Sequence, residues 1–276
     1  MFGRRTPKSE KWKKLPLVNH HIHNISLTER NWKDFRRIVS IDPGGLRREL
    51  RSFALRIEKR PMNSGPIEME VFEVVKFTHP SDEKLKAESS SELYKRVNNF
   101  LDKYYEYFIQ SHVIIIEQQM HVNYQSIRIM QHVITYFSLM LRNTKLLPML
   151  IEIDNKLKTK ELNSPPNLNE NGIKKWSIEL AEQLLILRND QESLNILKQA
   201  KKKDDLADSI LQSEALCRYL GWPSTYTEHE SRFTLIPEQR TYVPTFSDSR
   251  KNLYAFMTSD SSINTKLAKI NIVESK

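Results

Sequence analysis

The sequence predicts an α/β fold in which helices flank a mixed five-stranded sheet, built from a three-stranded meander followed by parallel strands. Two observations lead to this fold class. Alternating apolar segments joined by short turns fill the chain between residues 38 and 77, as in antiparallel strands with one buried face. Further along, apolar strand-like runs alternate with helical patterns, which is typical of parallel strands connected by helices.

The meander is expected to begin with the buried strand Ile38–Ile41, which ends at the turn residues Asp42–Gly45. The second strand, Ser52–Arg60, alternates in polarity, and after a turn at Pro61–Pro66 the segment Ile67–Phe77 alternates again. The residues of the second strand that should face the core are Phe53, Leu55 and Ile57.

The parallel part of the sheet should contain two further strands. Glu92–Gln110 has apolar positions at helical spacing, and the β-branched run Val113–Ile116 after it predicts a central strand. Asn123–Leu141 then predicts a helix and Leu147–Ile153 the fifth strand.

The last third of the domain should be helical. We expect a loop over Asn155–Gly172, a helix over Ile173–Lys203 and a final core helix over Asp204–Leu220. Gly221-Trp222-Pro223 should end that helix, because glycine and proline commonly follow a helix C-terminus.

Composition and charge suggest one domain with polar extensions: a basic flexible arm over residues 1–34, the domain over 35–224 and an extension over 225–276. Residues 1–60 hold 16 Lys or Arg and 6 Asp or Glu, in a chain of net charge +9. Such a basic region attracts nucleic acid, although it could also be a tail that only aids solubility. The single cysteine, Cys217, and the lack of a long apolar run predict a soluble intracellular protein with no membrane contact.

Four acidic residues stand where a metal site could form. Asp42 and Glu117 follow the first and fourth predicted strands, while Asp205 and Asp208 are three residues apart on one face of the last helix. If the two strands are adjacent, their carboxyl ends meet where open α/β sheets bind ligands. Each motif alone also has a structural explanation, because Asp42 could form a turn and the acids of 204–208 could offset the helix dipole.

Four crowded carboxylates repel one another and resist ionising together, so the cluster implies a cation such as Mg²⁺. An acidic pocket in a basic chain indicates an enzyme that acts on nucleic acid.

Three motifs together resemble RuvC-type Holliday junction resolvases, above all the branch of poxviruses, other large DNA viruses and fungal mitochondria. They are Ser40–Gly44 on the first strand, Ile115–Gln119 on the fourth, and Lys203–Ser209 on the last helix. Their order, spacing and context agree with the family over about Arg37–Leu220. The resemblance implies a ribonuclease H-like fold, and a homodimer that resolves four-way DNA junctions by paired symmetric nicks.

The resemblance also assigns roles to residues. It implies two Mg²⁺ ions per active site, replaceable by Mn²⁺, on the catalytic and metal-binding residues Asp42, Glu117, Asp205 and Asp208, with Asp204 as an alternative to Asp205. It implies a location in the cytoplasm or nucleus of an infected cell, or alternatively in a mitochondrion. Lys201 or Lys203 could contact the scissile phosphate, or belong to a solvated lysine run.

The chain departs from the family at residues 45–51, where an arginine-rich insert follows the first motif. This insert could bind junction phosphates or be a solvent loop. The predicted DNA contacts are therefore Arg47, Arg48, Arg51, Lys201 and Lys203. The alternative function is a non-catalytic nucleic-acid binder on the same fold, like the fungal mitochondrial relatives that serve as RNA splicing cofactors. A third is another ribonuclease H-like nuclease, acting on hybrids or transposon ends.

Overall fold

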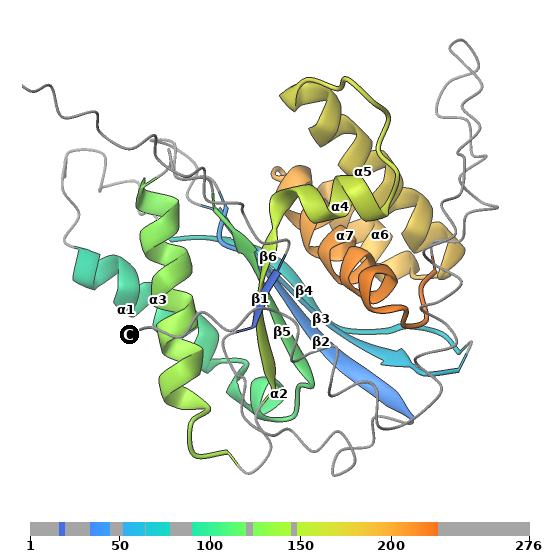
Figure 1. Ribbon diagram of the computed structural model, residues 1–276. Helices are drawn as coiled ribbons and strands as arrows, with labels where there is room; N and C mark the ends of the chain where they lie inside the picture. The colour runs from blue at the N-terminus through green and yellow to red at the C-terminus, as the bar shows by residue number, and fades with distance from the viewer. Residues whose placement is uncertain are drawn as a thin grey trace, which may run out of the picture.

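A mixed β-sheet lies at the centre of the structure, a computed structural model that describes residues 17–19, 34–44, 52–63, 65–77, 90–119, 124–144 and 148–225 (Figure 1). Its strands are β1 (Leu17–Asn19), β2 (Phe35–Asp42), β3 (Ser52–Pro61), β4 (Glu68–Lys76), β5 (Val113–Gln118) and β6 (Met149–Asp154). The helices are α1 (Ser90–Asp102), α2 (Tyr105–Ile109), α3 (Tyr124–Met140), α4 (Asn155–Glu161), α5 (Glu170–Leu187), α6 (Gln191–Gln199) and α7 (Lys203–Leu220).

The strand order is β1-β6-β5-β2-β3-β4. Strands β2, β3 and β4 pair antiparallel as a meander, whereas β5 lies parallel to both β2 and β6. The prediction of a meander followed by parallel strands is therefore confirmed.

A sixth strand adds to the five that the sequence predicts. Leu17–Asn19, within the arm expected to be flexible, pairs antiparallel with Ile151–Ile153 of β6. The physical reason is that the edge of a sheet offers unpaired backbone groups, which a short extended segment can satisfy. The arm is thus not structureless over these three residues.

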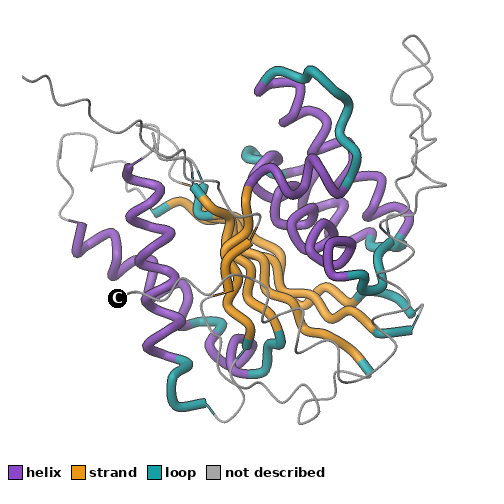
Figure 2. Tube along the Cα trace, in the orientation of Figure 1, coloured by secondary structure: helices purple, strands orange, loops and turns teal. Residues whose placement is uncertain are grey.

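Helices cover both faces of the sheet (Figure 2). Helices α1, α2 and α3 pack with Val39, Ile41 and Ile114 on one face, and α4 to α7 pack with Ile38 and Ile115 on the other. Successive residues of β2 and β5 alternate between two separate cores. This explains why the buried runs Ile38–Ile41 and Val113–Ile116 carry apolar side chains toward both faces of the sheet. Among the described helices, none combines the length and apolar character needed to cross a membrane.

Three helical expectations are wrong in detail. The predicted loop Asn155–Gly172 contains α4, because the Asp154 side chain accepts a hydrogen bond from the Lys156 backbone N–H (2.9 Å) and so caps a helix. The single helix Ile173–Lys203 is instead α5 and α6, separated by a turn in which Asn189 has a positive φ of 55°. Likewise Glu92–Gln110 divides into α1 and α2.

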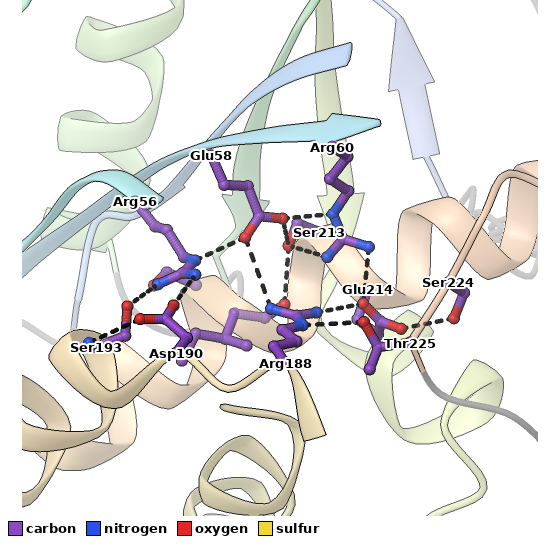
Figure 3. A network of polar contacts seen from close by, with 12 residues as sticks. Arg56, Glu58, Arg60, Arg188, Asp190, Ser193, Ser213, Glu214, Ser224 and Thr225 are labelled. Atoms are coloured by element: carbon purple, nitrogen blue, oxygen red, sulfur yellow. Dashed lines mark hydrogen bonds and ion pairs between the residues drawn. The ribbon is translucent and has the colours of Figure 1, made fainter. Parts of the chain in front are cut away.

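The face of β3 opposite Phe53, Leu55 and Ile57 is also buried, although it carries charged side chains. Arg56 and Glu58 are fully buried, and Arg60 is 3% exposed. Three arginines and three acids meet there (Figure 3), and we call this group the buried ion cluster. Its members are Arg56, Glu58, Arg60, Arg188, Asp190 and Glu214.

Glu58 is expected to stabilise the fold in a pH-dependent way. Burial raises the pKa of Glu58, but Arg60, Arg56 and Arg188 outweigh burial and hold it far below its ordinary value. Glu58→Gln should therefore lower the free energy of unfolding by about 3 kcal/mol at neutral pH. The loss should shrink as the pH falls below about 4, because the unfolded glutamate then binds a proton that folded Glu58 does not.

Urea denaturation of the wild type and of Glu58→Gln, between neutral and acid pH, measures the difference in their free energies of unfolding. The control is Glu68→Gln on β4, where the carboxylate is 66% exposed and lies 3.4 Å from Lys59 Nζ. An exposed pair should contribute less than about 1 kcal/mol. Equal losses in the two variants, or a Glu58→Gln loss that does not depend on pH, would contradict the expectation.

Candidate active site

Asp42 and Glu117 lie side by side at the carboxyl edge of the sheet. The parallel register pairs Ile41 with Ile116, so the next residue of each strand is one of the two acids. Both side chains are buried, with 4% and 7% exposed. Strands β2 and β5 are far apart in sequence, but they are neighbours in the sheet. The expected adjacency of the two strands is therefore confirmed.

The turn after β2 orients the Asp42 carboxylate. The Gly44 backbone N–H donates a 2.8 Å hydrogen bond to Asp42 Oδ1. Gly44 has a φ of 65°, and a Cβ atom there would lie 1.9 Å from the Ser52 carbonyl oxygen. Only glycine fits this position without displacing β3, so Gly44 is part of how the site is built.

Helix α7 brings two more acids to this edge. One carboxylate oxygen each from Asp42, Glu117 and Asp208 lie within 4.8 Å of one another. Asp205 stands beside this trio, where its Oδ2 accepts a hydrogen bond from Ser52 Oγ and its charge raises the pKa of Asp42. Asp204 instead lies 3.5 Å from Lys174 Nζ. Of the two neighbouring aspartates, the geometry therefore turns Asp205 toward the trio.

A buried lysine that the sequence did not predict lies beside these acids. Lys158 of α4 is 6% exposed, and its Nζ pairs with Asp208 Oδ2 and lies 3.5 Å from Glu117 Oε1. Burial lowers the pKa of Lys158, but Asp208 and Glu117 outweigh burial and raise it, so the ammonium stays charged. The available signal was position: β6 is parallel to β5, so residues just after it reach the same edge.

Three acids of the site, Asp42, Glu117 and Asp205, hold protons more tightly than isolated carboxylates do. Burial, followed by the charges of Glu117, Asp205 and Asp208, raises the pKa of Asp42 well above its ordinary value. Burial also raises the pKa of Glu117, against the opposing charge of Lys158, and that of Asp205, against the Ser52 hydrogen bond. Negative charge is thus crowded here, and one ammonium offsets part of it.

The donor set fits a hard divalent cation. All the candidate ligands are carboxylate oxygens, which Mg²⁺ prefers, and oxygens bound to one Mg²⁺ lie up to about 4 Å apart. The observed 4.8 Å span of the trio is close to this. Asp208 Oδ1 is buried and has no hydrogen-bond partner among the described residues. A bound ion would satisfy that oxygen and the local excess of negative charge.

The basic residues predicted to contact DNA have different outcomes. Arg47, Arg48 and Arg51 lie outside the described residues. Lys201 is exposed and Lys203 is half-buried at the start of α7. The lysine whose charge lowers the pKa of Asp205 is their neighbour, Lys202.

No protein-family model matches the sequence. One segment is 25% identical over 115 residues to uncharacterized protein 97L of Invertebrate iridescent virus 3. The match covers 42% of this chain and 52% of the viral protein, so the chain spans about half the length of that relative.

Three solved structures are similar to this one. The yeast mitochondrial Holliday junction resolvase Ydc2 has a TM-score of 0.43 and 18% identity, with 67% of this chain and 80% of that chain covered. The fowlpox virus resolvase, solved with substrate Holliday junction DNA, has a TM-score of 0.41 and 19% identity, with 65% of this chain and 97% of that chain covered. RuvC of T. thermophilus, solved with Holliday junction substrate, has a TM-score of 0.41 and 13% identity, with 67% of this chain and 96% of that chain covered. All three neighbours are Holliday junction resolvases, and at these identities the likeness is one of fold.

Proposed function

We propose that this protein is a Mg²⁺-dependent endonuclease that cuts branched DNA, with four-way junctions as its substrate. The observation that carries the proposal is the convergence of Asp42, Glu117 and Asp208 at one edge of the sheet, with oxygens within 4.8 Å. The three motifs that supply these acids are those that resemble the RuvC-type resolvases. A pure binder would gain nothing from a buried cluster of negative charge facing phosphates.

Each residue of the site has a role in this proposal. Asp42, Glu117 and Asp208 hold a divalent ion, and Asp205, bonded to Ser52 Oγ, supplies the further carboxylate that a second ion needs. When bound, Mg²⁺ or Mn²⁺ supplies the charge that activates a water molecule and stabilises the leaving oxygen. Lys158 offers a buried ammonium at the same place, and so stabilises negative charge on the phosphate.

The proposal includes recognition of the substrate by shape. A homodimer presents two sites with the two-fold symmetry that paired nicks require. Backbone phosphates are then bound by basic side chains outside the carboxylate cluster, while bases contribute little. The candidates for these contacts are Arg47, Arg48, Arg51, Lys201 and Lys203.

Cleavage of a labelled four-way junction tests the function. With Mg²⁺ we expect symmetric pairs of ligatable nicks, no cutting of linear duplex, and no cutting of any substrate after EDTA removes the ion. Preferential cleavage of an RNA–DNA hybrid would instead identify another ribonuclease H-like nuclease. Salt-sensitive RNA binding without cleavage of any substrate would identify a non-catalytic binder.

A further inference from the structure

Strand β3 and helix α7 are connected by polar contacts at two places. Near the carboxylate cluster, Ser52 Oγ of β3 donates to Asp205 of α7. At the other end of β3, the buried ion cluster reaches the middle of the same helix, at Ser213 and Glu214. The helix that carries two of the four site acids is thus held by charged groups outside the site.

The contacts to the middle of α7 are short and directional (Figure 3). Ser213 Oγ donates to Glu58 Oε1 at 2.7 Å and accepts from Arg60 Nη2 at 3.0 Å. Glu214 Oε2 lies 2.8 Å from Arg60 Nη1 and also accepts from Arg188 Nη2. Two successive residues of α7 are therefore bonded to two alternate residues of β3.

The same cluster reaches the α5–α6 turn. Arg188 follows α5, and Arg56 of β3 donates to Ser193 Oγ at 3.0 Å and to Asp190 Oδ2 at 3.2 Å at the start of α6. Strand, turn and helix are thus joined by one charge-balanced group. Figure 3 shows these side chains pointing toward one another between the sheet and the helices.

Stability alone is a weak explanation for such a cluster. Buried ion pairs often stabilise a fold no more than well-packed apolar residues would, because desolvation offsets the attraction. Apart from these contacts, the buried side of α7 is largely small or apolar, including Ala207, Ala215 and Leu216. Apolar contact is not directional, so by itself it restrains sliding and rotation of a helix weakly.

A metal site demands a closely fixed helix. A slip of α7 by one residue moves Asp208 by about 1.5 Å and turns it by about 100°. Either change would separate its oxygen from those of Asp42 and Glu117, whereas ion ligation tolerates little misplacement.

We propose that the buried ion cluster sets the position of α7 on the sheet, and that Ser213 and Glu214 are positioning residues for Asp205 and Asp208. The inference rests on the proposed function, because it takes the four acids as metal ligands. The affinity of the site for metal then depends on the contacts of Ser213 and Glu214 with the buried ion cluster.

The test measures Mn²⁺ binding to the full chain by electron paramagnetic resonance of the free ion, without DNA. Ser213→Ala should weaken Mn²⁺ binding about 10-fold, and Glu214→Gln about 100-fold. The matched control is Ser209→Ala, because Ser209 is also fully buried on α7 but its Oγ bonds only to the Leu206 carbonyl among the described residues. Its affinity should stay within about twofold of wild type.

A second control separates position from stability. Leu216→Ala removes a fully buried apolar side chain from α7, so it should lower the urea midpoint yet leave Mn²⁺ affinity within about twofold. If Glu214→Gln does not fold, the comparison of Mn²⁺ affinity between Ser213→Ala and Ser209→Ala still tests the inference.

Three outcomes would overturn the inference: wild-type affinity in Ser213→Ala, an equal loss in Ser209→Ala, or an affinity that follows the urea midpoint through all variants. Wild-type protein that binds no Mn²⁺ would overturn the proposed function and the inference together.

Discussion

Asp208→Asn is expected to slow junction cleavage about 1000-fold or more while leaving junction binding in EDTA unchanged. Asp208 gives one of the three oxygens that lie within 4.8 Å, and its Oδ1 is buried without a hydrogen-bond partner among the described residues. Asparagine keeps the volume but loses the negative charge that holds a divalent ion. The loss should therefore appear in the rate of the chemical step and in metal affinity, rather than in DNA affinity.

The neighbouring aspartate provides the matched control. Asp204 lies on the first turn of the same helix, but it pairs with Lys174 at 3.5 Å. Asp204→Asn makes the same chemical change and should alter cleavage by less than about threefold. Single-turnover cleavage and gel-shift binding of both variants give the comparison. Near-normal cleavage by Asp208→Asn would show that the carboxylate cluster is not the site of the reaction.

The arrangement of Asp42 and Glu117 could be predicted because it depends on local patterns. A buried apolar run that ends in an acid defines both a strand and the edge at which it ends, and parallel pairing then brings such ends together. The i, i+3 spacing of Asp205 and Asp208 likewise follows from helix geometry. These rules are independent of which side chains pack between the elements, so they hold without coordinates.

Lys158 and the buried ion cluster could not be predicted in the same way. Lysine and arginine are read as solvent-exposed, and their burial depends on partners far away in sequence. Arg56 needs Asp190, and Lys158 needs Asp208, before either can be placed inside. The alternation of β3 identified the Phe53 face correctly, but it could not show that helices also cover the charged face.

Lys158→Met is expected to change metal affinity and cleavage in opposite directions. The Lys158 ammonium pairs with Asp208 and lies 3.5 Å from Glu117 Oε1. It therefore competes with a divalent ion for the same oxygens. At a fixed pH, removing this competitor should tighten Mn²⁺ binding about 10-fold.

Cleavage should nevertheless fall about 100-fold, because methionine lacks the ammonium that stabilises negative charge on the phosphate. The control is Lys156→Met, which removes an exposed lysine from the same short helix and changes the net charge equally. If Lys158→Met weakens metal binding and cleavage together, the lysine only holds the acids in place. Tighter binding with slower cleavage means instead that this ammonium takes part in the reaction itself.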